Sequence, residues 1–198
     1  MNPLTIALAA TPEPPWPARV DATRSDLAQY FGEQGYTTGA EIGTLRGQYA
    51  QTLCEANPAL HLLAIDPWVG YAGYHDQRQA VSDRLPWIYL EATNRLRSYD
   101  CELWRMTSED AAPKVADESL DFVFIDGNHA KPYVTQDLTL WTPKVKLGGI
   151  IAGHDYHHFT RAPYRHIQVI EAVDEFVAEH AIGPWWLLNE GTYLWRRS

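Results

Sequence analysis

The stretch GAEIGTLRGQYA, residues 39–50, places an acidic residue two positions before a glycine and a second glycine four positions after it. The spacing differs from the dinucleotide fingerprint G-x-G-x-x-G, which would need a glycine at Leu45. The run at 37–43 predicts a short strand, and a helix is expected to begin near Gly47. The stretch therefore predicts a strand that turns through Gly43 into a helix.

Further segments of the same two kinds follow along the chain. Strands are predicted at residues 61–67, 101–108, 119–127 and 148–156, each ending on polar residues. Helices are predicted at 23–34, 76–98 (broken or kinked by Pro86), 134–145 and 166–181, with a short one after 108. Five strands that alternate with helices predict an α/β fold with a parallel sheet covered on both faces.

The C-terminal segment PWWLLNEGTYLWRR predicts an antiparallel hairpin around a two-residue turn at Glu190 and Gly191. With this hairpin the sheet becomes seven-stranded and mostly parallel. The chain has eight tryptophans, which are many for one small domain, and those at 185, 186 and 195 in or beside the hairpin cannot all face inward on alternating strands. A surplus of exposed aromatic side chains would suggest a homodimer.

The composition bounds the class of protein. A chain of 198 residues with 45% hydrophobic and 21% charged residues is typical of one globular domain, predicted at 23–198 after a Pro-rich lead-in at 1–22. The net charge of −9 disfavours a nucleic-acid partner. The apolar run at 4–10 is too short for a membrane span or a typical signal peptide. Cys54 and Cys101 form no disulfide framework, which predicts a cytoplasmic location.

Polar residues close all five predicted parallel strands. They are Gly43, Asp66, Ser108, Asp126 and the pair His154-Asp155. A single acid at a strand end is usually a helix cap or a turn former. Five such positions at one edge of a sheet instead indicate a ligand site beyond the carboxyl ends of the strands.

In this order the motifs resemble those of class I S-adenosylmethionine-dependent methyltransferases, which have a Rossmann-like doubly wound fold. EIGTLRG resembles the first motif of that family, E/D-x-G-x-x-x-G, and the resemblance extends from about residue 37 through the hairpin. It implies that Glu41 helps to hold the methionine ammonium, and that Gly43 and Gly47 shape the turn beside the cofactor. Without a Cβ, Gly43 would let the backbone approach the methionine end.

The other cofactor contacts implied by the resemblance lie at later strand ends. Asp66 would accept hydrogen bonds from both ribose hydroxyls. The segment MTSEDAA would place Ser108 and Glu109 beside the adenine. Asp126 would lie close to the methionine end.

The segment after the fourth strand, IDGNHAKPY, bears on the methyl acceptor. It lacks the Asn/Asp-Pro-Pro-Tyr motif of amino methyltransferases, and neither cysteine is placed as the nucleophile of a pyrimidine C5 enzyme. It resembles instead the metal-dependent O-methyltransferases: the catechol-type enzymes and the bacterial enzymes that methylate sugar or antibiotic hydroxyls. The acceptor implied is the hydroxyl of a small molecule, such as a sugar, a phenol or a natural product.

This branch of the family implies a divalent cation, Mg²⁺ or Mn²⁺, which would stabilise the oxyanion of the acceptor. Its ligands would be Asp126, Asp155 and His154, the last of which departs from the Asp-Asn or Asp-Asp pair of the family. Asp126 would thus also be catalytic. His129 takes the place of a lysine thought to act as base, and the alternative is that it is a surface loop residue.

Other functions use the same residues. A metal-dependent hydrolase could be built on Asp126, His129, His154 and Asp155, and a non-catalytic methyltransferase-fold protein would need only the cofactor site. The aromatic residues within 67–90 either stack on the acceptor or pack a lid onto the core.

Overall fold

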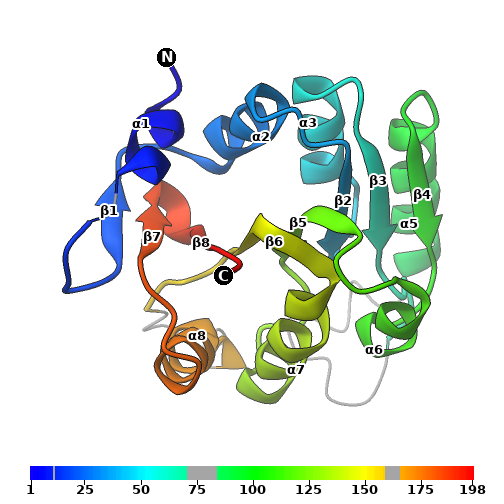
Figure 1. Cartoon of the computed structure of the whole chain (residues 1–198). Coiled ribbons are helices and arrows are strands. Elements are labelled where there is room, and N and C mark those ends of the chain that lie inside the picture. The colour runs from blue at the N-terminus through cyan, green and yellow to red at the C-terminus, as the bar shows by residue number, and fades with distance from the viewer. Residues whose placement is uncertain (11, 71–83, 159–165) are drawn as a thin grey trace.

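The computed structural model describes residues 1–10, 12–70, 84–158 and 166–198. In this part of the chain a single sheet of eight strands lies at the centre, with helices on both sides (Figure 1). The strands run in the order β1-β7-β8-β6-β5-β2-β3-β4, and β8 alone is antiparallel to its neighbours. The predicted α/β fold with a mostly parallel sheet and a C-terminal hairpin is confirmed.

The strands are β1 (Ala18–Val20), β2 (Thr38–Ile42), β3 (His61–Ile65), β4 (Cys101–Trp104), β5 (Leu120–Ile125), β6 (Val145–Gly153), β7 (Trp185–Leu188) and β8 (Tyr193–Arg196). The α-helices are α1 (Pro3–Ala9), α2 (Arg24–Glu33), α3 (Gln48–Ala56), α5 (Leu85–Leu96), α6 (Ser108–Ala111), α7 (Lys131–Trp141) and α8 (Val169–Glu179). Short 3₁₀ turns cover Ala112–Lys114, Thr142–Lys144 and Asn189–Gly191.

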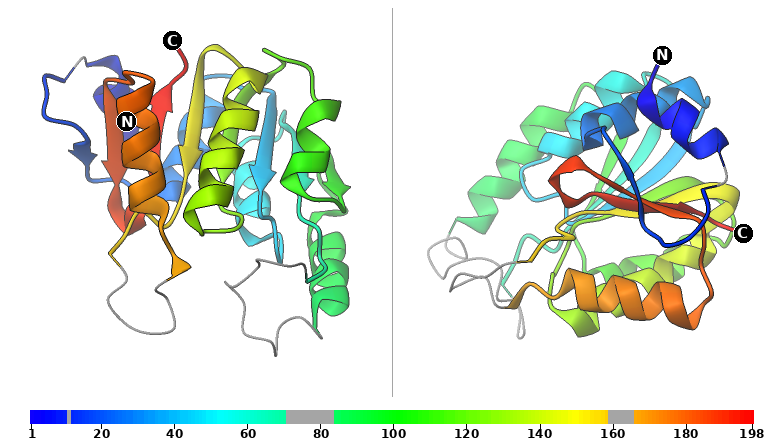
Figure 2. Two further views of the ribbon diagram at one scale, coloured as in Figure 1. Left: turned by 90° about the horizontal axis from the view of Figure 1, so that it is seen from below. Right: turned by 90° about the vertical axis from the view of Figure 1, so that its left-hand side faces the viewer.

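Two hydrophobic clusters cover the two faces of the sheet. One joins α6, α7 and α8 to the sheet around Trp141, and the other joins α1, α2 and α3 to it around Phe122. Figure 2 shows these two helical layers on opposite sides of the strands. The near-continuous apolar strands β3 and β5 follow from this burial on both faces.

Three local predictions need correction. The sheet has an eighth strand, β1, which pairs with β7 inside the predicted lead-in, and α1 packs there with Leu4 and Leu8 buried. The hairpin turn has three residues, Asn189–Gly191, because the Leu188 amide donates to the carbonyl of Thr192. Pro86 lies in the first turn of α5, where proline is tolerated, and does not kink it. Residues 76–83 of that predicted helix lie outside the described residues.

The tryptophans of the hairpin do not form an exposed patch. Trp185, Trp186 and Trp195 are all buried, because helices cover both faces and each side of the hairpin packs against one cluster. The expectation that some of them would be surplus is therefore wrong. A homodimer stays a prediction, and an exposed aromatic patch on the hairpin no longer supports it. No helix in the described ranges is long and apolar enough to cross a membrane.

The strand ends are held together by a close backbone approach. Gly43 directly follows β2 with φ +94°, and a Cβ there would lie far inside the contact distance of the Asp126 carbonyl oxygen. The Asp126 amide donates to the Ile42 carbonyl at 2.8 Å, and the His154 amide to that of Ile125 at 3.1 Å. Consequently the polar residues that follow β2, β5 and β6 lie side by side at the carboxyl edge.

We predict that Gly43→Ala destabilises the fold more than Gly148→Ala does. Both glycines have positive φ, but no atom lies within 4 Å of a Cβ built on Gly148. Gly148→Ala should therefore lower the free energy of unfolding by backbone strain alone, about 1–2 kcal/mol. Gly43→Ala should lose a further ~1–3 kcal/mol from the overlap with Asp126. Equal losses in urea denaturation would contradict the role given to this contact.

Candidate functional site

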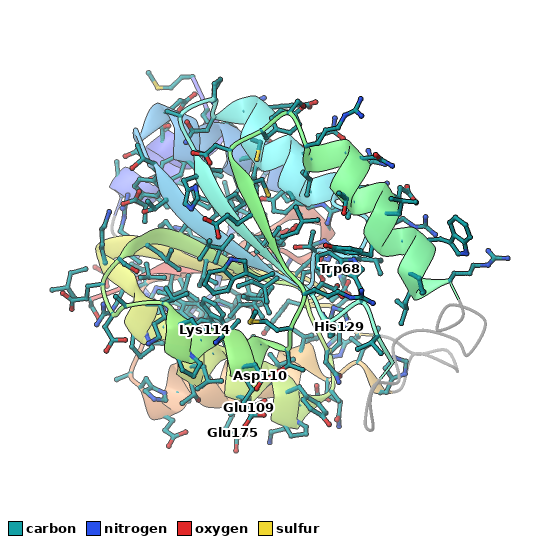
Figure 3. The ribbon with its side chains drawn as sticks, turned by 90° about the vertical axis from the view of Figure 1, so that its right-hand side faces the viewer. Trp68, Glu109, Asp110, Lys114, His129 and Glu175 are labelled. Atoms are coloured by element: carbon teal, nitrogen blue, oxygen red, sulfur yellow. The ribbon has the colours of Figure 1, made fainter. Side chains whose placement is uncertain are left out.

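A cavity of about 620 Å³ opens at the carboxyl edge of the sheet. Eight of the predicted site residues line it: Glu41, Gly43, Asp66, Ser108, Glu109, Asp126, His129 and Asp155. Gly47 and His154 are not part of the lining. Figure 3 shows Trp68 and His129 near the point where the strands end. The structure therefore brings most of the predicted residues to one site.

Asp66 follows β3 and holds two loops of the cavity wall. Its carboxylate accepts hydrogen bonds from the amides of Leu45, at 2.9 Å, and Trp68, at 2.7 Å. The Trp68 indole donates to the Leu45 carbonyl at 2.7 Å, so the two loops are tied to each other as well. Burial raises the pKa of Asp66 in spite of these two backbone donors. Each carboxylate oxygen keeps a lone pair for a ligand hydroxyl.

Glu41 lies near the end of β2 and is buried, with 3% of its surface exposed. Burial raises the pKa of its carboxyl to about 8, although the Thr44 side chain opposes the shift, and the charges of Asp126 and Asp66 add to it. Within the described residues its Oε2 atom has no hydrogen-bond partner. A buried carboxylate oxygen without a donor is unfavourable, and a ligand cation would stabilise it.

Ser108 belongs to a buried chain of hydrogen bonds. Its hydroxyl donates to Asp137 and accepts from the Trp141 indole at 2.8 Å. Burial raises the pKa of Asp137 to about 7, although the bond from Ser108 opposes the shift. The Ser108 hydroxyl therefore donates its proton to Asp137 and not to a ligand in the cavity. Glu109 is exposed at the rim of the cavity, on α6 (Figure 3).

Contacts within the protein explain why both positions of the first motif, 43 and 47, are glycine. The Gly43 backbone approaches Asp126, so its missing side chain serves this contact whether or not a cofactor is bound. Gly47 precedes α3 with φ +72°, and a Cβ there would lie 2.9 Å from the Leu96 side chain. Gly47 therefore permits the packing of α3 against α5, which the sequence pattern did not indicate.

His129 joins the two carboxylates that follow β5 and β6. Its Nε2 lies 3.1 Å from Asp126 Oδ1 and 3.1 Å from Asp155 Oδ2, and the side chain is 15% exposed. The loop is held because Asn128 accepts from the Ala130 amide at 3.1 Å. The imidazole is thus a partly buried bridge between two acids, which does not fit the alternative of a surface loop residue.

The same edge contains a group that could hold a metal ion. Ligand atoms of Asp126, His154 and Asp155 lie within 4.8 Å of one another. His154 Nδ1 is 3.1 Å from Asp155 Oδ1. Burial alone would raise the pKa of Asp155, but the His154 hydrogen bond and the nearby imidazoles of His129 and His157 hold it below its ordinary value. Two carboxylates and an imidazole suit a divalent cation such as Mn²⁺ or Mg²⁺.

Some cavity residues were missed by sequence reasoning. Arg24, at the start of α2, and Asp137, in the middle of α7, both line the cavity. Neither lies in a recognised motif. For Asp137 a signal did exist, because it falls on the same helical face as Val134, Leu138 and Trp141, where an acid is unusual. Trp68, in the aromatic segment, packs with Leu85, Ile88 and Ala92 in the core.

Comparison with known proteins identifies the family. A family described as a methyltransferase domain matches residues 40–156, more than half of the chain. An uncharacterized protein of Acanthamoeba polyphaga mimivirus is 28% identical over 162 residues, which cover 81% of this chain and 67% of the viral protein. The chain therefore belongs to this family of methyltransferase domains.

Solved structures share the fold at low sequence identity. A putative caffeoyl-CoA O-methyltransferase from Staphylococcus aureus superposes with a TM-score of 0.65 at 16% identity, covering 98% of this chain and 89% of that one. The O-methyltransferase TomG from Streptomyces achromogenes, solved in complex with S-adenosylmethionine, gives a TM-score of 0.62 at 15% identity, covering 88% and 80%. These structures confirm the Rossmann-like methyltransferase fold.

We predict that Glu41→Gln stabilises the protein in the absence of ligand above pH 5. The folded-state pKa of about 8 lies above the ordinary value of 4.5 for this carboxyl, so the folded state keeps a proton that the unfolded state loses. Wild-type stability should then fall between these two pH values by up to about 1.4 kcal/mol per pH unit, and that of Glu41→Gln should not. Thermal melts at pH 5 and 8 measure the difference. A difference that does not grow with pH would contradict the buried, unpaired state of Glu41.

Proposed function

We propose that this protein is an S-adenosylmethionine-dependent methyltransferase that methylates a hydroxyl of a small molecule with the help of a divalent cation. The observation that carries the proposal is that two groups of residues line one cavity. Glu41 and Asp66 are the acids of the predicted cofactor site. The cluster of Asp126, His129 and Asp155 lines the same cavity. Family membership supports the methyl transfer, and the cluster supports an oxygen acceptor.

The residues present fit the cofactor. The sulfonium and ammonium groups of S-adenosylmethionine are cationic, and Glu41 offers a buried oxygen without a donor. Asp66 is fixed by two backbone amides and keeps lone pairs for the ribose hydroxyls. TomG, of the same fold, binds S-adenosylmethionine. Bound in this cavity, the cofactor would supply an electrophilic methyl group.

The cluster at the ends of β5 and β6 fits the activation of an alcohol or phenol. A hydroxyl is a poor nucleophile until it loses its proton. His129 lines the cavity and is oriented by two carboxylates, each of which stabilises the imidazolium that forms when it takes that proton. Asp126, Asp155 and His154 would hold the cation, which would stabilise the oxyanion of the acceptor.

A small acceptor is preferred over a nucleic acid because of the charge of the cavity. Six carboxyl groups line it, at Glu41, Asp66, Glu109, Asp126, Asp137 and Asp155. Those of them that are ionised would repel the phosphates of a nucleic acid. Structural neighbours named as O-methyltransferases support an oxygen acceptor.

The first test is a calorimetric titration with S-adenosylhomocysteine, with and without Mg²⁺. Saturable binding is expected without the metal, because the cofactor residues are already positioned. A metal-dependent hydrolase would bind the cation but not the nucleoside, and this outcome would refute the proposal. Binding without transfer to any hydroxylated acceptor would instead favour a non-catalytic protein.

We predict that Asp155→Ala keeps S-adenosylhomocysteine affinity within about twofold and abolishes metal-stimulated methyl transfer. Among the described residues the Asp155 carboxylate contacts His129 and His154, and neither Glu41 nor Asp66 is one of its partners. Asp117→Ala is the matched control, since that exposed carboxylate pairs with Lys144 and does not line the cavity. Full activity of the wild type after chelation would show that no cation takes part. Loss of cofactor binding in Asp155→Ala would show that the two sites are not separate.

We predict that His129→Ala loses rate mainly at low pH. Without the imidazole an acceptor hydroxyl must be deprotonated by solvent, which becomes easier as pH rises. The measured quantity is kcat between pH 6 and 9. A loss of about 100-fold at the acidic end should shrink toward the alkaline end, within the usual range for a general base. A loss that is uniform across pH would assign His129 to positioning alone.

A further inference from the structure

Arg24 is a cation in a cavity in which acids outnumber the basic side chains. Six carboxyl groups face two arginines among the described lining residues. One of the two, Arg46, already forms an ion pair with Glu91. The guanidinium of Arg24 is 3.8 Å from Asp126 Oδ2, which is longer than a hydrogen bond. Arg24 is therefore the cation best able to meet an anionic group of a ligand.

The position of Arg24 is fixed by its surroundings. It is the first residue of α2, whose start is capped by Thr23 and Asp26. Tyr49 donates its hydroxyl to the Arg24 carbonyl at 3.0 Å, and the guanidinium lies over the Tyr49 ring, 5.2 Å from its centroid. The side chain remains 38% exposed. This contact orders the guanidinium before any ligand arrives.

Tyr49 also connects Arg24 to Glu41. Burial raises the pKa of the Tyr49 hydroxyl, the charge of Glu41 raises it further, and that of Arg24 opposes the shift. Arg24, Tyr49 and Glu41 also all line the same cavity. An α-amino acid carries an ammonium and a carboxylate on one carbon. Its binding site therefore needs a carboxylate and a cationic side chain that lie near each other but do not pair with each other.

We propose that Arg24 binds the carboxylate of the methionine part of the cofactor while Glu41 binds its ammonium. This inference rests on the proposed function. The acids of the cavity attract the sulfonium and the ammonium, but they repel the carboxylate of the same molecule. Arg24 offsets that repulsion at the one place where the cofactor is anionic. Its fork of donors matches a carboxylate, which an ammonium side chain would do less well.

The test compares two ligands that differ only in the carboxylate: S-adenosylhomocysteine and its decarboxylated analogue. Calorimetry measures both affinities for the wild type, Arg24→Gln and Arg46→Gln. The wild type should prefer the carboxylate-bearing ligand by about 10- to 100-fold, the range for a charged hydrogen bond. In Arg24→Gln this preference should fall to near unity. Arg46→Gln should keep it, because Arg46 is engaged by Glu91.

Two results would overturn the inference while leaving the proposed function intact. One is an unchanged preference in Arg24→Gln. The other is an equal loss for both ligands, which would mean that Arg24 acts through Tyr49 on the shape of the site. Failure of the wild type to bind either ligand would refute the proposed function itself. If Arg24→Gln does not fold, Arg24→Lys carries the test: it should retain part of the preference, and a preference equal to the wild type's would refute the role of the guanidinium.

Discussion

The close approach of Gly43 to the Asp126 carbonyl is the constraint on which the site depends. It lets β2 and β5 lie as neighbours up to their last residues, and β6 continues the same edge beside β5. Because these three strands end together, Glu41 at the end of β2 and the carboxylates that follow β5 and β6 share one cavity. The candidate cofactor residues and the candidate catalytic cluster are thus brought together by one strand order.

Concentrating acids at one edge is unfavourable for the folded protein, and four of the six acids that line the cavity have an identified stabilising partner. Asp66 accepts two backbone amides. Asp137 is buried beside the Ser108 hydroxyl, and its pKa rises to about 7. Asp126 and Asp155 are bridged by His129. The like charges of the cluster are therefore kept together by an imidazole, without requiring a cation to hold the fold.

The strands and the parallel edge of the sheet could be predicted from the sequence, because they depend on hydrophobic periodicity and on the order of the elements. Apolar runs ending in Asp66 and Asp126 marked the strands, and their alternation with helices implied a parallel edge where those acids meet. The sequence could not predict β1, whose three residues follow a Pro-rich run and form a strand only by pairing with β7. The prediction that some of Trp185, Trp186 and Trp195 are exposed failed because the covering of both faces was applied to the parallel strands and not to the hairpin. Arg24 was missed because its position depends on the tertiary contact with Tyr49.

Glu41 is stabilised less than these acids, since only the Thr44 side chain opposes the rise of its pKa. Among the described carboxylates of the cavity wall, its Oε2 is the buried oxygen without a hydrogen-bond donor. Arg24 is close enough to affect the same Tyr49 ring, yet no ion pair joins Arg24 to Glu41 among the described residues. Had the two paired, the site would be more stable but closed to a zwitterion. An unpaired acid and an ordered cation beside one aromatic ring are instead what a ligand bearing both charges requires, so the instability of Glu41 is itself a mark of function.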